Sequence, residues 1–133
     1  DEARRLLLEV FRLLRAGQPV AIFPEGGRQF SGRVGVAKPG VGLLAVSARV
    51  PIVPVLLQGT FEALPPGAKR LRPTKIRVAF GPTIMYAEQS PSEALNTSLA
   101  KEVTASWQRL QYIPWNTLPH NPCLPSRTRD RQA

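Results

Sequence analysis

The chain has 133 residues, a formal net charge of +9 and a pI of 11.1. This length suffices for one small domain and is too short for two, and the 43% hydrophobic content is not that of a disordered chain. The basic excess favours anionic partners: phosphorylated small molecules, acidic lipid headgroups or nucleic acid. The single cysteine, Cys123, excludes an internal disulfide, and no Cys/His cluster has the spacing of metal ligands.

The first third of the chain predicts two helices with a strand and a loop between them. Residues 2–16 carry leucines and valine at helical spacing, with arginines toward the other side. The apolar run 19–23 is typical of a buried strand. Residues 24–36 then form a glycine-rich, charged loop, and residues 40–49 a second, short helix.

The middle of the chain predicts two strands around a polar loop. The first strand spans 52–57 and contains Pro54, which indicates an edge, a bulge or the end of strand pairing. A polar loop follows at 58–73. Residues 75–80 alternate, which predicts a half-buried strand. Its apolar side is expected to carry Ile76, Val78 and Phe80, and its other side Lys75, Arg77 and Ala79.

The last third predicts a long helix and then a tail. Ser90-Pro91-Ser92-Glu93 resembles a helix start, and the helix is expected to reach about Tyr112. Its apolar face carries Leu95, Leu99, Val103, Trp107 and Leu110. The proline-rich residues 114–133 are expected to be a disordered tail. The order of elements indicates an α/β domain over 1–113.

The loop 24–36 contains the residues most suited to binding a ligand. Its glycines let the backbone approach a ligand closely, and Arg28 offers a planar fork that suits a phosphate. Arg33 and Lys38 add positive charge. Glu25 would repel a phosphate unless it pairs with Arg28 or accepts a hydrogen bond from a substrate hydroxyl. The competing interpretation is a solvated glycine-rich turn.

The residues Phe23-Pro24-Glu25-Gly26-Gly27-Arg28 closely resemble the Phe-Pro-Glu-Gly-Thr-Arg-Ser motif of the 1-acylglycerol-3-phosphate acyltransferase family. Gly27 stands where the family usually has Thr, and Gln29 where it usually has Ser. Both departures remove a hydroxyl group, which bears on hydrogen bonding and on the choice of acceptor.

Two further segments resemble the family in the same order. Ala37-Lys38-Pro39-Gly40 is similar to its Phe-Lys-Lys-Gly segment, and Ile52-Val53-Pro54-Val55 to its Val-Pro-Val strand. Residues 78–84 resemble the strand and turn that follow. The resemblance covers about residues 4–112. It implies a glycerolipid acyltransferase-like sheet flanked by helices, with the N-terminal portion missing, an expectation that also fits the first residue, Asp1.

The resemblance also implies a reaction. The family moves an acyl group from acyl-CoA or acyl-acyl carrier protein to the free hydroxyl of a lysophospholipid, in phospholipid biosynthesis. It uses an Asn-His-x-x-x-x-Asp motif, whose His is the general base. The only histidine here is His120, and residue 125 is Pro, so no catalytic residue is assigned. The expected substrate-binding residues are Glu25, Gly26, Gly27, Arg28, Lys38 and Pro54.

No metal or cofactor is expected besides the acyl donor, and the chain alone is expected to be inactive. Its expected location is the cytoplasmic face of a membrane. No transmembrane segment is expected, because the longest apolar stretches have about ten residues. One alternative is a non-catalytic domain that binds lipid phosphates or other anions. Nucleic-acid binding has only the charge in its favour, since no recognition motif accompanies it. The basic run Lys69–Arg72 is either a solvated loop or a contact for acidic headgroups or for the phosphates of coenzyme A.

Overall fold

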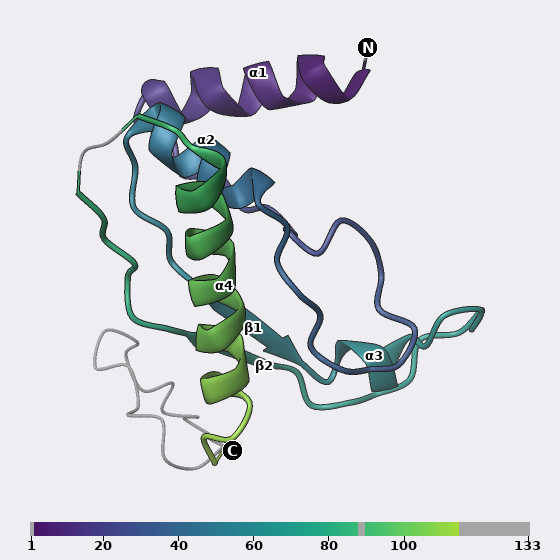
Figure 1. Cartoon of the computed structure of the whole chain (residues 1–133). Coiled ribbons are helices and arrows are strands. Elements are labelled where there is room, and N and C mark those ends of the chain that lie inside the picture. Colours follow the sequence, from purple (N-terminus) through teal and green to yellow (C-terminus); the bar gives the residue numbers. More distant parts are fainter. Residues whose placement is uncertain (1, 88–89, 115–133) are drawn as a thin grey trace, which may run out of the picture.

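A computed structural model describes residues 2–87 and 90–114. Within them lie four helices and one small sheet, so the chain is a mixed α/β protein. The long helix α4 runs down one face of the sheet, α2 packs against α4, and α1 extends across the top (Figure 1). The elements in chain order are α1 (Glu2–Arg15), α2 (Gly40–Ala48), β1 (Val55–Gln58), α3 (Thr60–Ala63), β2 (Arg77–Phe80) and α4 (Glu93–Leu110).

Helix α4 forms one side of the core, as its sequence predicts. Ser92 caps its first turn, because the Ser92 hydroxyl accepts a hydrogen bond from the Leu95 amide at 3.2 Å. One face of α4 is buried against α2 and the sheet and consists mainly of Leu99, Val103, Trp107 and Leu110. The predicted apolar face is therefore confirmed, and Trp107 is a core residue.

The sheet in the described residues is an antiparallel pair, β1 and β2, in which Val55 lies opposite Phe80 and Leu57 opposite Val78. Pro54 comes immediately before β1. Its carbonyl still accepts a hydrogen bond from the Gly81 amide at 2.8 Å, but proline itself has no N–H to donate. The strand ladder therefore stops at Pro54, one of the three predicted outcomes, and only the bridge between Ile52 and Ile84 lies beyond it.

The predicted orientation of the second strand is wrong. Its alternation is present, but Arg77 and Ala79 are buried, with 5% and 2% of their surfaces exposed, whereas Phe80 is 69% exposed. The side that faces α4 is the Arg77 and Ala79 side. Arg77 can lie there because its Nη1 donates to the Gln58 Oε1 at 3.0 Å and to the Ile113 carbonyl at 2.7 Å.

The predicted strand at 19–23 is also wrong, since these residues have no regular structure. Phe23 is 74% exposed, and Pro19 has no N–H for a ladder. A buried strand needs neighbours to pair with, and within the described residues no strand pairs with this segment. The short helix α3, in turn, lies inside the predicted polar loop 58–73.

Helix α1 confirms the predicted helix at 2–16 but is only partly packed. Val10, Phe11 and Leu14 are half-buried, whereas Leu6 and Leu7 are exposed. No helix in the described residues has the length and apolarity needed to cross a membrane. The predicted tail, apart from Pro114, lies outside the described residues, as do His120 and Cys123.

Candidate phosphate-binding site

The glycine-rich segment is a closed loop whose two ends are held together. The Lys38 amide donates a hydrogen bond to the Pro24 carbonyl at 2.8 Å, so residues 24–38 leave the scaffold and return to the same place, as in an Ω-loop. Next to this closure the Ala37 amide donates to the Thr104 hydroxyl at 3.0 Å, and that hydroxyl donates to the Ala100 carbonyl. Helix α4 therefore fixes the base of the loop.

The loop begins with a tight turn that requires glycine at position 26. The Gly26 amide donates to the Phe23 carbonyl at 3.2 Å, and Gly26 has a φ of +77°, a backbone conformation that favours glycine. The Lys38 ammonium nitrogen lies 2.6 Å from the position that a Cβ on Gly26 would take. The Lys38 side chain thus lies across the turn, and a side chain at position 26 would displace it.

The Glu25 side chain holds the loop by accepting a hydrogen bond from the loop backbone. One carboxylate oxygen of Glu25 accepts a hydrogen bond from the Gly35 amide at 3.0 Å. A Cβ on Gly35 would collide with this carboxylate and with the side-chain amide of Gln29. The salt bridge to Arg28 that the sequence suggested for Glu25 is not formed in the described structure, where Arg12 and Glu9 make the ion pair.

Arg28 is exposed and is held by a residue distant in sequence. Its Nη2 donates a hydrogen bond to the Leu64 carbonyl at 3.1 Å, just beyond the end of α3. The loop also packs on α3 through Gly32, which leaves no room for a side chain beside the Phe61 ring. Sequence reasoning did not predict α3 or this anchor. The guanidinium is steadied by one N–H, and its exposed remainder can bind an anion.

The structure brings most of the predicted binding residues into one loop but not all of them. Glu25, Gly26 and Lys38 lie at its turn and closure, and Gly27 and Arg28 follow on the same loop. Pro54 is instead fully buried at the start of β1, beside Gly81. The described residues contain no cluster of three side chains that could hold a metal ion.

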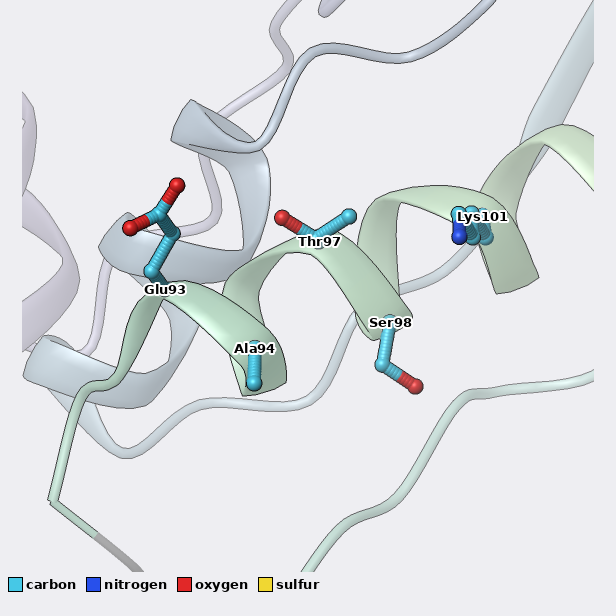
Figure 2. Close-up of a pocket in the computed structure, with 5 residues that line it drawn as sticks. All are labelled: Glu93, Ala94, Thr97, Ser98 and Lys101. Carbon is cyan, nitrogen blue, oxygen red and sulfur yellow. The ribbon is translucent and has the colours of Figure 1, made fainter.

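A shallow hollow on the described surface lies elsewhere, on the exposed side of α4. Figure 2 shows Glu93 and Thr97 pointing to one side of this helix and Ala94 and Ser98 to the other. With Lys101 they line a shallow surface formed by one helix alone. Binding sites usually combine convergent polar groups from several elements, so the loop 24–38 is the better candidate.

Comparison with known proteins shows a family match for the segment that contains this loop. Residues 1–58 match the pattern of the acyltransferase family, and this segment contains α1, the loop, α2 and β1. This part of the chain, residues 1–58, is similar to acyltransferases. The recognition by motif is therefore confirmed.

Several curated acyltransferases are similar to the chain. It is 38% identical over 63 residues to the chloroplastic 1-acyl-sn-glycerol-3-phosphate acyltransferase BAT2 of Brassica napus, covering 47% of this chain and 18% of that protein. It is 33% identical over 101 residues to a 1-acyl-sn-glycerol-3-phosphate acyltransferase of Chlamydomonas reinhardtii, covering 71% and 30%. A probable enzyme of the same name from Mycoplasma pneumoniae is 31% identical over 85 residues, covering 64% and 32%.

The matches to these three acyltransferases span between 18% and 32% of the relatives' length. No solved structure matches the chain.

Proposed function

We propose that residues 24–38 hold the phosphate of a lysophospholipid, such as 1-acylglycerol 3-phosphate, for acyl transfer from acyl-CoA or acyl-acyl carrier protein in phospholipid biosynthesis. The observation that carries this proposal is Arg28, exposed on a loop whose ends and middle are all anchored. The names of the relatives support the substrate class.

The proposed chemistry of the loop is positioning. The fork of Arg28 and the ammonium of Lys38 would bind the phosphate oxygens. Because the Glu25 carboxylate accepts the Gly35 N–H, part of its charge is satisfied within the loop. Fixing the phosphate places the acceptor hydroxyl for attack on the thioester carbonyl, which is a proximity effect. The attacking oxygen loses its proton to a base, and the thiol of the donor leaves.

The base is the part of this reaction that these 133 residues do not provide. No His-x-x-x-x-Asp sequence is present, so we expect binding of the acceptor without turnover by the chain alone. The coding sequence before Asp1 tests the enzymatic role: an Asn-His-x-x-x-x-Asp motif there supports it. An intact gene without the motif favours the second candidate, a non-catalytic lipid-phosphate-binding domain.

The proposed location of the reaction depends on the acceptor lipid. A lysophospholipid resides in a bilayer, which supports a reaction at a membrane surface, and we propose the cytoplasmic face of that membrane. We also propose that the helices and sheet are part of a glycerolipid acyltransferase-like fold over residues 1–113.

The test is binding of short-chain lysophosphatidate to the full chain, measured by titration calorimetry. Arg28→Gln is expected to weaken binding about tenfold to a hundredfold, because a charge-assisted hydrogen bond contributes about 1.5–3 kcal/mol. Arg28→Lys should recover only part of the affinity, since the fork is lost.

Arg33→Gln is the matched control, because Arg33 is an exposed arginine of the same loop whose hydrogen bond to the Ser31 hydroxyl uses only its backbone amide. A monoacylglycerol of equal chain length controls for the phosphate. Equal affinities of the native chain and Arg28→Gln would rule out Arg28 as the phosphate ligand.

A further inference from the structure

A second basic surface lies beside the candidate site, on the loop between α3 and β2. Between Glu62 and Arg77 the sequence has four basic residues and no acidic one. These basic residues are Lys69, Arg70, Arg72 and Lys75, and all four are exposed. Figure 1 shows this loop projecting away from the sheet and α4, next to α3. We call residues 68–75 the basic loop.

The basic loop carries an apolar residue among its charges. Leu71 stands between Arg70 and Arg72 and is 75% exposed. The loop has a defined shape: the Ala68 amide donates to the Pro65 carbonyl at 3.0 Å, and residues 68–73 line a shallow hollow. Leu71 is therefore an exposed apolar side chain within a basic loop of defined shape.

The basic loop and the phosphate-binding loop are anchored at adjacent residues. The Arg72 amide donates to the Ala63 carbonyl at 2.8 Å, and Arg28 donates to the Leu64 carbonyl at 3.1 Å. Both hydrogen bonds are made at the C-terminal end of α3. A surface that bound the basic loop would therefore lie near the place proposed for the acceptor phosphate.

We propose that the basic loop docks on an anionic bilayer, with Lys69, Arg70 and Arg72 on acidic headgroups and Leu71 in the interface. Charge complementarity selects an anionic surface. Leu71 selects a bilayer rather than a soluble phosphate compound, because its side chain gains from leaving water. This proposal deepens the proposed function by naming the surface that would bring the phosphate-binding loop to its lipid. The purpose of the docking rests on the proposed function, whereas the docking itself does not.

Helix α1 is the competing surface. It combines exposed Leu6 and Leu7 with four arginines, which is the composition of an interfacial helix. Its net charge is lower, because Glu2 and Glu9 lie on the same helix, and Glu9 pairs with Arg12 at 3.6 Å. The basic loop has no acidic residue, so it is favoured as the main contact.

The test is co-sedimentation of the full chain with vesicles of phosphatidylcholine containing phosphatidylserine, against vesicles of phosphatidylcholine alone. Each basic residue near an anionic surface contributes about 1 kcal/mol, or about fivefold in affinity. The triple variant Lys69→Gln/Arg70→Gln/Arg72→Gln is therefore expected to bind anionic vesicles about a hundredfold more weakly. Leu71→Asp should also reduce binding, and added salt should weaken the native chain more than the triple variant.

Two control variants separate the possible outcomes. Lys101→Gln/Arg109→Gln removes two exposed charges from α4 and should retain most of the binding. Arg4→Gln/Arg5→Gln tests α1. The proposal is overturned if the α1 variant loses binding while the loop variant keeps it. It is also overturned if the basic loop binds soluble coenzyme A but no vesicles. Circular dichroism checks that each variant is folded.

Lysophosphatidate binding, measured without vesicles, distinguishes the two proposals. Loss of vesicle binding in the loop variant, with lysophosphatidate binding retained, supports a separate docking surface. If Arg28→Gln leaves lysophosphatidate binding unchanged while the loop variant still loses vesicle binding, the proposed function fails and the docking surface stands.

Discussion

Glu25 comes three residues before Arg28, so its charge would oppose a bound phosphate if both side chains faced the ligand. The structure turns this carboxylate inward, where it accepts the Gly35 amide. A negative charge is thus used to hold the loop in shape. This arrangement depends on Gly35, because the carboxylate and the Gln29 amide occupy the space of a side chain there.

We predict that Gly35→Ala disrupts this loop. The added methyl group must displace Glu25 or Gln29, at a cost of about 1–3 kcal/mol, and the proposed phosphate binding should weaken with it. Limited proteolysis of the loop and lysophosphatidate titration measure the effect. Gly27→Ala is the control for the proteolysis, because a Cβ at Gly27 meets nothing within 4 Å. Equal behaviour of the two variants would contradict this account of Gly35.

The residues of the candidate loop stand out in the sequence, but their hydrogen-bond partners do not. Glu25, Gly26, Arg28 and Lys38 belong to one short segment with a family motif. The anchors are non-local: Arg28 bonds to a carbonyl 36 residues away and Ala37 to a hydroxyl 67 residues away. No periodicity or spacing indicates such pairs.

At the scale of elements, α2 and α4 approach so closely that glycine is needed between them. A Cβ on Gly42 would lie 2.6 Å from the Asn96 Cα and close to its carbonyl oxygen. The two helices meet backbone to backbone at this point, and the core residues Val41, Ala45 and Val46 pack around it.

We predict that Gly42→Ala destabilises the chain although alanine favours helices. The helices must separate, which loosens the packing of α2 on α4, and overpacking of this kind costs about 1–3 kcal/mol. The free energy of unfolding from urea denaturation measures the loss. Gly40→Ala, in the same helix with nothing within 4 Å, should be neutral or stabilising. A Gly42 variant as stable as the Gly40 variant would refute the close approach.

The strands show which part of the fold a hydrophobic pattern can predict. Alternation over 75–80 places Arg77 and Ala79 on one side and Val78 and Phe80 on the other. Which side is buried depends on where α4 packs, and here α4 covers the side with the arginine. The helices were better predicted, because their hydrogen bonds are local, whereas the strand expected at 19–23 needed a partner.

At the scale of the whole molecule, one side of the sheet is covered by α4, and the other side is apolar and exposed. Val55 and Phe80 form one cross-strand pair on the exposed side, and Leu57 and Val78 form the next. A sheet of two strands is marginally stable alone. The stability of the described part therefore depends mainly on the α2–α4 core and on tertiary hydrogen bonds.

Tyr86 makes one of these hydrogen bonds, because its hydroxyl donates to the Val50 carbonyl at 2.6 Å. Burial raises the pKa of Tyr86 above its ordinary value of 10.0. A raised pKa in the folded state means that folding favours the protonated phenol. The contribution of Tyr86 is therefore complete below pH 10 and is lost as the pH rises through the folded-state pKa.

We predict that Tyr86→Phe destabilises the chain by about 1 kcal/mol near pH 7, through loss of the hydrogen bond. The stability difference between the native chain and the variant should shrink as the pH rises above 10. Denaturation of both proteins at several pH values between 7 and 11 measures this difference. A difference that stays constant or grows over this interval would contradict the raised pKa.

The closure of the loop by Pro24 and Lys38 has an evolutionary consequence. Because the chain leaves and re-enters the scaffold at one point, the length and sequence between these residues can vary without moving α2, α4 or the sheet. Loop closure entropy grows slowly, so even a doubling of the loop would cost only about 0.6 kcal/mol. Changes within the loop can therefore accumulate while α2, α4 and the sheet stay in place.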